Sequence, residues 1–227
     1  MTLPPPNRKS SISSKSLWNE TIEASMIKTG IYGGTFNPIH FGHIRLAKLL
    51  LEKAQLDEVW FMVTPQNPFK VNQELVWDRY RYEMVEGALR RYKRLIASDF
   101  EFSLPKPSFT WNTLEALSKK YPDREFTVLI GGDNWEKIRL WHRHEDILAN
   151  YHVVVYPREG SSFDMNSLPP SVQVVDTPLI PISSTKVRQR LAQGKSVTRM
   201  VPKAAISFIE SHGLYGITPK NSIHHGQ

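Results

Sequence analysis

Two histidines stand three residues apart where a glycine-rich turn leads into a helical pattern. Residues 33–43 read GGTFNPIHFGH and follow an apolar segment that ends at Tyr32. The paired glycines, Gly33 and Gly34, let the main chain approach a ligand closely. A helix that starts near Gly42 would direct its free N–H groups and the positive end of its dipole at the same place. This combination favours a bound anion.

His40 and His43 can both point at an anion held over that helix N-terminus, where they would neutralise charge that develops on transferring phosphates. A bound phosphate raises the pKa of an imidazole and favours its donor form. Thr35 offers a further hydroxyl, and Asn37 a local cap. One histidine alone is more often structural, but the pair in this setting favours a ligand role. A zinc site is not expected, because the chain has no cysteine and the nearest acidic residue is Glu52.

A second candidate anion site lies roughly 140 residues further on, where residues 182–188 read ISSTKVR at the start of a helical pattern. Ser183 or Ser184 would cap this helix, its free N–H groups would face outward, and Arg188 would lie one turn in. Alone, such a segment is usually only a helix cap. Together with the first segment, it is stronger evidence for anion binding than either segment alone.

Short apolar, β-branched runs alternate with helical patterns, which predicts a parallel sheet with helices on both faces. The predicted strands cover residues 27–32, 59–63, 95–98, 126–130, 152–156 and 172–175. Apolar residues at helical spacing mark helices at residues 44–54, 84–95, 114–121, 187–191 and 205–209. Ligands of such sheets bind beyond the carboxyl ends of the strands, so the site is expected in the loops at 33–43, 64–70 and 131–135.

The composition favours small anionic ligands over a polymer. Lys and Arg number 29 and acidic residues 22, a formal net charge of +7, and the basic residues are scattered along the chain. We therefore expect no nucleic-acid partner, and the absence of any long apolar run predicts no membrane span. A chain without cysteine has no disulfide or thiolate metal site and suits a reducing, cytoplasmic compartment.

We expect one folded domain over residues 26–216, between a disordered N-terminal tail at 1–25 and a C-terminal tail at 217–227. The first 25 residues lack the apolar core of a signal peptide. Met26 stands directly before the first predicted strand and is a candidate start of the chain. Neither the tails nor the composition predicts an oligomeric state.

The segment GGTFNPIHFGH resembles the signature of the nucleotidyltransferase superfamily that carries H-x-G-H, and ISSTKVR resembles its I-S-S-T-x-x-R motif. Three weaker segments are similar to bacterial nicotinate-nucleotide adenylyltransferases: PSFTWNTL at 107–114, GGDN at 131–134 with Trp141 beyond, and PQNPFK at 65–70. The resemblance covers about residues 26–216. It implies a Rossmann-like, doubly wound α/β fold and adenylyl transfer from ATP to nicotinate mononucleotide, a cytoplasmic step of NAD biosynthesis.

The resemblance also implies roles for individual residues. The ATP phosphates would be held by His40, His43, Lys70 and Arg188, and the rest of the ATP site would comprise Gly33, Gly34, Thr35, Phe36, Asp133, Ser183 and Ser184. The pyridine nucleotide would contact Thr110 and Trp141, the latter by ring stacking. Phe69 stands where the family usually has histidine, so only Lys70 is carried over from that loop. Mg²⁺ would arrive with ATP, and no protein metal site is expected.

Some of these residues have plainer explanations, and other families share part of the pattern. Asp133 could instead only cap the helix after Gly132. A tryptophan such as Trp141 belongs to the hydrophobic core about as often as it contacts a ligand. Phosphopantetheine adenylyltransferases carry both anion motifs but are shorter and lack the middle segments, and cytidylyltransferases end in a different helix signature. A nucleotide- or RNA-binding module fits the charge of +7, but has no need for His40, His43, Ser184 and Arg188 together.

Overall fold

The structure is a computed structural model that describes residues 26–68, 75–161 and 167–219. The tail expected over residues 1–25 lies outside these residues, as do residues 220–227 of the expected C-terminal tail. Phe69 and Lys70, the two positions singled out in the loop after the second strand, also lie outside the described residues.

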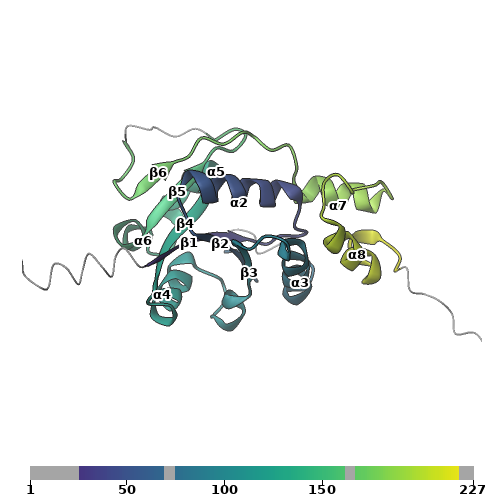
Figure 1. The fold of residues 1–227 in the computed structure, drawn as a ribbon, viewed down its shortest axis with the longest axis horizontal. Coiled ribbons are helices and arrows are strands. Elements are labelled where there is room, and N and C mark those ends of the chain that lie inside the picture. The colour runs from purple at the N-terminus through teal and green to yellow at the C-terminus, as the bar shows by residue number, and fades with distance from the viewer. Residues whose placement is uncertain (1–25, 69–74, 162–166, 220–227) are drawn as a thin grey trace, which may run out of the picture.

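In the described part of the chain, six parallel strands form one sheet in the order β3-β2-β1-β4-β5-β6 (Figure 1). The strands are β1 (Ile27–Gly34), β2 (Glu58–Val63), β3 (Leu95–Ser98), β4 (Arg124–Gly131), β5 (His152–Tyr156) and β6 (Val172–Val174). This confirms the predicted doubly wound α/β sheet and each of its strands. The strand order reverses between β1 and β4, so the ligand crevice is expected beyond the carboxyl ends of these two strands.

All five predicted helices are present: α2 (Phe41–Lys53), α3 (Asp78–Leu89), α4 (Thr110–Lys120), α7 (Ser184–Ala192) and α8 (Lys203–Ser211). Helical periodicity does not reveal α5 (Gly132–Trp135), which the sequence indicates only as the helix that Asp133 would cap, nor α6 (His144–Asn150), because both are too short to show a period. The 3₁₀ turns η1 (Phe100–Ser103), η2 (Ile138–Leu140) and η4 (Leu214–Gly216) are not predicted from the sequence. The prediction that the second helix extends to Leu95 is wrong, whereas the prediction of a strand at 95–98 is confirmed. The chain leaves α3 after Leu89 and turns, and Leu95 begins β3.

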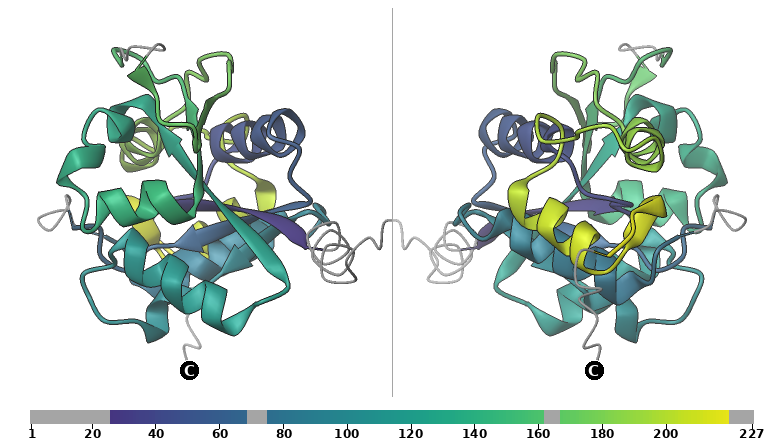
Figure 2. Two further views of the ribbon diagram at one scale, coloured as in Figure 1. Left: turned by 90° about the vertical axis from the view of Figure 1, so that its left-hand side faces the viewer. Right: turned by 90° about the vertical axis from the view of Figure 1, so that its right-hand side faces the viewer.

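The strands bury residues on both faces, as their near-continuous apolar sequences require. One core joins Tyr32 and the alternate residues of β2 to α2, α3, α7 and α8, whereas Ile31 and the intervening residues pack against α4 and α6. Since neighbouring strand residues point to opposite faces, the two cores lie on opposite sides of the sheet. Figure 2 shows the yellow helix α8 beside the blue helix α3, with which it packs.

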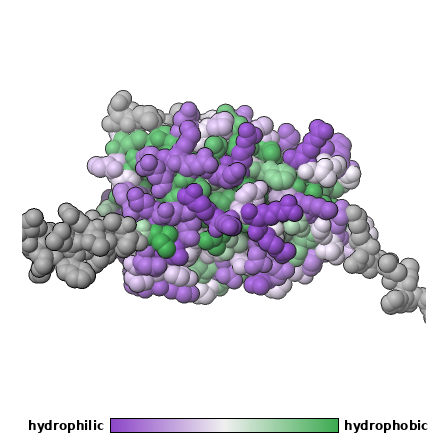
Figure 3. All heavy atoms as spheres, in the orientation of Figure 1, coloured by the Kyte–Doolittle hydropathy of each residue, from purple (hydrophilic) through white to green (hydrophobic). Residues whose placement is uncertain are grey.

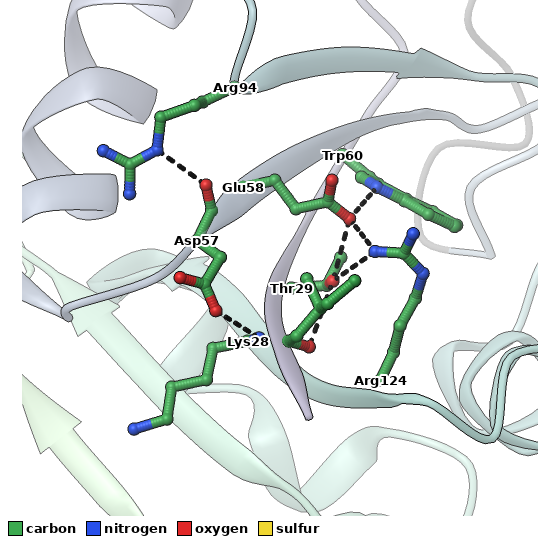
Figure 4. A network of polar contacts seen from close by, with 8 residues as sticks. Lys28, Thr29, Asp57, Glu58, Trp60, Arg94 and Arg124 are labelled. Atoms are coloured by element: carbon green, nitrogen blue, oxygen red, sulfur yellow. Dashed lines mark hydrogen bonds and ion pairs between the residues drawn. The ribbon is translucent and has the colours of Figure 1, made fainter. Parts of the chain in front are cut away.

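Figure 4 shows a polar network at the amino-terminal ends of β1, β2 and β4, the edge of the sheet opposite the crevice. Arg124 forms an ion pair with Glu58, and these side chains are only 18% and 15% exposed. Oε1 of Glu58 also accepts hydrogen bonds from Thr29 Oγ1 at 3.0 Å and from Trp60 Nε1 at 2.7 Å. The network ties the three central strands together at one end and leaves their other ends to the loops that build the site.

The surface is mixed in polarity. Figure 3 shows hydrophilic side chains interspersed with smaller hydrophobic patches over one face. Two of the most exposed large hydrophobic side chains, Leu140 and Leu179 at 70% and 59%, belong to the walls of cavities that are described below. Among the helices of the described residues, none combines the length and the apolar character that a membrane crossing requires.

Candidate active site

The glycine turn after β1 brings His40 and His43 face to face at the start of α2. Their imidazole rings stack with centroids 3.6 Å apart and planes 13° from parallel. His40 is the N-cap residue: its Nδ1 accepts the main-chain N–H of His43, and Nδ1 of His43 accepts the main-chain N–H of His40, each at 3.3 Å. The pair is a reciprocal cap that satisfies two main-chain donors at the helix start. The cap expected from Asn37 is therefore wrong, because His40 occupies that position.

The reciprocal cap also fixes the protonation of both rings. Since Nδ1 accepts in each ring, the single proton of the neutral imidazole belongs on Nε2. Burial, aided by the positive charge of Arg158, lowers the pKa of His40 to about 4. Burial, followed by the charges of His40 and Arg158, lowers the pKa of His43 well below 6.5. At neutral pH each ring therefore offers one Nε2–H to an anion without carrying a charge itself.

The ISSTKVR segment docks directly on the glycine turn. Ser183 is the N-cap of α7, as the sequence predicts, and its hydroxyl accepts a main-chain N–H at 3.2 Å. Ser184 Oγ donates to the carbonyl oxygen of Pro38 at 2.9 Å, and Arg188 Nη1 donates to that of Asn37 at 2.7 Å. The first turns of α2 and α7 therefore meet at one place.

Both motifs line one hollow of about 380 Å³, which we call the central cavity. Ten of the predicted site residues line it: Gly33, Gly34, Thr35, Phe36, His40, His43, Asp133, Ser183, Ser184 and Arg188. Asp133 comes from α5, directly after β4, and its side chain is 60% exposed. Phe36 is buried and packs edge-on against the ring of His43 at a centroid distance of 5.0 Å. The crevice that the strand order predicts is thus lined by the residues that the motifs predict.

Two further cavities share walls with the central cavity. The α4 cavity, about 330 Å³, is lined by Thr110 and Trp141, and its wall includes Gly33, Gly34 and Asn134 of the central cavity. The β5 cavity, about 730 Å³, is lined by residues 156–159 and 177–183 and shares both histidines with the central cavity. The central cavity thus adjoins both of the others, and the histidine pair lies in the wall that it shares with the β5 cavity.

Arg158 is a cation of the site that the sequence analysis did not single out. It lies two residues after β5, lines the central and β5 cavities, and approaches Asp133 to 3.8 Å. Its guanidinium lies 5.5 Å from the ring centroid of Tyr156, which packs edge-on against Tyr32 at a centroid distance of 6.3 Å. Arg158 lies in the loop after β5. The same rule that placed the site in the loops after β1, β2 and β4 also indicates this loop.

Arg81 is a second residue that sequence reasoning missed. It is only 1% exposed, and its guanidinium donates to four main-chain carbonyl oxygens at 2.7 to 3.4 Å, those of Thr35, Thr64, Pro65 and Val76. These bonds brace the turn after β1 against the loop after β2. No sequence pattern reveals such a role, because every partner is a main-chain group.

The carboxylates of the site fit a metal ion that is held mainly by phosphate and water. Among the described residues, no group of three or more His, Cys, Asp or Glu side chains is placed to hold a metal. Asp133 is the one carboxylate among the described residues that line the central cavity. Mg²⁺ keeps several waters and commonly binds through substrate phosphates and one or two carboxylates.

A turn with H-x-G-H, a second motif docked on it, and a sheet of this strand order define a nucleotidyltransferase. The cytidylyltransferase-like family model matches residues 31–190. A Bacteroides fragilis protein named "Probable nicotinate-nucleotide adenylyltransferase" is 51% identical over 170 residues, which cover 75% of this chain and 85% of that protein. A protein of the same name from Bacteroides thetaiotaomicron is 43% identical over 196 residues, with 86% and 97% covered. The chain belongs to the nicotinate-nucleotide adenylyltransferase family, as its motifs indicate.

A solved structure supports the fold at greater distance. The nicotinic acid mononucleotide adenylyltransferase of Plasmodium falciparum, solved in complex with NaAD, superposes with a TM-score of 0.72 at 19% sequence identity. The match covers 85% of this chain and 98% of that one. The Rossmann-like architecture is therefore common to both proteins.

Proposed function

We propose that this protein transfers the adenylyl group of ATP to nicotinate mononucleotide, giving nicotinate adenine dinucleotide and pyrophosphate as a step of NAD biosynthesis. The observation that carries the proposal is the central cavity, which is lined by both phosphate-binding motifs and shares wall residues with two further cavities. A reaction that joins two nucleotides through their phosphates needs a nucleoside pocket on either side of the reacting groups. The names of the relatives support the same reaction.

The chemistry requires positioning and charge stabilisation. The 5′-phosphate of the mononucleotide attacks the α-phosphorus of ATP, the bond from that phosphorus to the bridging oxygen breaks, and pyrophosphate leaves with the electron pair. The attacking phosphate is already ionised at neutral pH, so no general base is needed. The protein must hold the two anions in line and stabilise negative charge on the leaving group.

The described residues suit these tasks. We assign the ATP phosphates to the central cavity, where His40 and His43 would each donate Nε2–H and Arg188 would supply positive charge. The adenosine would occupy the β5 cavity, with Asp133 accepting from a ribose hydroxyl. The pyridine nucleotide would occupy the α4 cavity against Thr110 and Trp141. Lys70, outside the described residues, would add a further cation.

We propose that Mg²⁺ enters with ATP and offsets charge on its phosphates. Asp133 is the residue placed to contact the ion, directly or through water, because its carboxylate lines the central cavity. We also propose a cytoplasmic location, which suits a chain without cysteine that consumes ATP.

Pyrophosphate release from ATP and Mg²⁺ tests the proposal, with nicotinate mononucleotide, its amide analogue and phosphopantetheine as parallel acceptors. Fast release with the acid nucleotide and slow release with the amide is the expected result. Release with phosphopantetheine alone would assign the protein to that sister activity. No release with any acceptor would reject adenylyl transfer, and salt-sensitive RNA binding in its place would favour a binding module.

A further inference from the structure

The α4 cavity has an unusual charge balance for a pocket that takes an anion. No lysine or arginine is present among the described residues that line it, and its ionisable side chains there are Glu101, His142 and Tyr156. Glu101 is only 6% exposed. A nicotinate ring carries a carboxylate, so an ionised Glu101 in the same wall would repel it.

The contacts of Glu101 favour an uncharged carboxyl group. Its Oε1 lies 2.8 Å from Thr113 Oγ1, which in turn lies 3.3 Å from the carbonyl oxygen of Phe109. Thr113 Oγ1 donates to Oε1 at the shorter of these two distances, and the carbonyl oxygen of a neutral carboxyl group can accept this bond as a carboxylate oxygen can. Oε2 is buried and has no hydrogen-bond partner among the described residues. A buried carboxylate with an unsatisfied oxygen is costly, whereas the neutral acid is tolerated.

Among the described residues, no charged group lies where it would hold Glu101 ionised. Burial raises the pKa of its carboxyl, and the nearby hydroxyls of Thr113, Thr64 and Ser108 oppose that shift more weakly. No charged group contributes to the shift, either from α4 or from the ends of β2 and η1. The hydrogen bond between Glu101 of η1 and Thr113 of α4 connects two segments of the cavity wall.

We propose that Glu101 works as an uncharged carboxylic acid and is a specificity-determining positioning residue: it joins the wall of the α4 cavity while leaving that wall free of negative charge, so that a mononucleotide with an anionic ring substituent is accepted. This inference rests on the proposed function and deepens it. The protonation state of this one buried side chain would then explain why the enzyme prefers the acid nucleotide to the amide.

The test compares the wild type with Glu101→Gln, which is close in shape and permanently neutral, and with Glu101→Ala. Glu115→Gln, an exposed change on α4, is the matched control. At pH 7 we expect Glu101→Gln to keep the KM for nicotinate mononucleotide within about threefold, and Glu101→Ala to raise it by about tenfold or more, with the KM for ATP unchanged in both. With rising pH, the acid-to-amide ratio of kcat/KM should fall in the wild type and stay flat in Glu101→Gln. A tenfold loss in Glu101→Gln with the acid nucleotide would show that the charged form is required and would overturn the proposal.

A readout that needs no catalysis separates this proposal from the proposed function. If the folded chain holds the proton on Glu101, the free energy of unfolding of the wild type should fall relative to Glu101→Gln as pH rises above 4.5, and level off at the folded pKa of Glu101. If the stability difference between the two proteins stops changing only above pH 7, Glu101 is uncharged in the working enzyme and the proposal is supported. If the difference stops changing below about pH 6, the proposal is overturned whatever the activity. A wild type that levels above pH 7 but transfers no adenylyl group would reject the proposed function, and the selectivity claim with it.

Discussion

His40 and His43 hold each other: Nδ1 of each ring accepts the main-chain N–H of the other across a stack of 3.6 Å. One pair of side chains therefore does two jobs. The Nδ1 atoms complete the start of α2, and the Nε2–H groups are left for a ligand. Helix capping depends on the Nδ1 atoms, and ligand binding depends on the Nε2–H groups. Substitutions can therefore remove one function and keep the other.

His40→Asn should separate these jobs at the cap position. Asn is among the best N-cap residues, so we expect the free energy of unfolding to stay within about 0.5 kcal/mol of the wild type. The variant has no Nε2–H, and kcat should fall by about two orders of magnitude. Urea unfolding and pyrophosphate release measure the two effects. Equal losses of stability and activity would contradict the division of roles.

His43→Ala should lower kcat by about two orders of magnitude or more, because a donor to the reacting phosphates is lost. The fold should survive, since the variant gives up one cap bond worth about 1 kcal/mol. Circular dichroism and thermal unfolding check the fold beside the activity assay. A variant with normal turnover would remove His43 from the mechanism.

The histidines should make the chain less stable as the pH falls. Their pKa values are lower in the folded chain than the usual 6.5, so the unfolded chain binds more protons below that pH. The free energy of unfolding should therefore decrease from about pH 6.5 to about pH 4, with a contribution from His40 on the order of 3 kcal/mol. Urea titrations of the wild type and His40→Asn at several pH values isolate this term. Parallel curves for the two proteins would refute it.

Arg81→Leu should weaken both the fold and the site. The substitution leaves four carbonyl oxygens without their donor and should cost about 3 kcal/mol of unfolding free energy. KM for both substrates should rise, since Arg81 braces the turn beside the central cavity and the loop beside the α4 cavity. Arg79→Leu, which removes only exposed ion pairs on the same helix, should cost no more than about 1 kcal/mol. Equal costs for the two variants would contradict the bracing role.

Arg158→Met should raise the KM for ATP by about tenfold, because a cation beside the phosphates is lost. It should also raise the pKa of His40, since the charge of Arg158 lowers it. NMR titration of the imidazole signals and initial rates measure the two effects. Arg139→Met, at an exposed position of η2, is the control and should change neither.

Much of the fold follows from local patterns. Most strands carry short runs of apolar, β-branched residues, and α2, α4, α7 and α8 carry apolar residues at helical spacing. In α6, Ile147 is the one residue that is buried, so no period exists to be read. The motifs located the central cavity for a similar reason: the glycines, the histidines and the Ser-Ser-Thr cap are local signals in the loops that follow strands.

The remaining parts depend on tertiary contacts that have no local signal. The arginine at position 81 is one of many in the sequence, and only the fold surrounds it with carbonyl oxygens. The reciprocal cap depends on the ring orientation of two residues whose types alone indicate ligand binding. The charge state of Glu101 depends on burial, which a run such as DFEFS does not reveal.

The bonds from Ser184 and Arg188 to the turn at Pro38 and Asn37 join the first βα unit of the chain to its last third. Tyr215 adds a hydrogen bond to Asn37 at 2.7 Å. A nucleotide held between these segments would act as a reversible cross-link, since it binds only where both are present. Substrate occupancy and the local opening of α7 would then be a single linked equilibrium, so the cellular level of ATP would set how firmly α7 is held against the turn after β1.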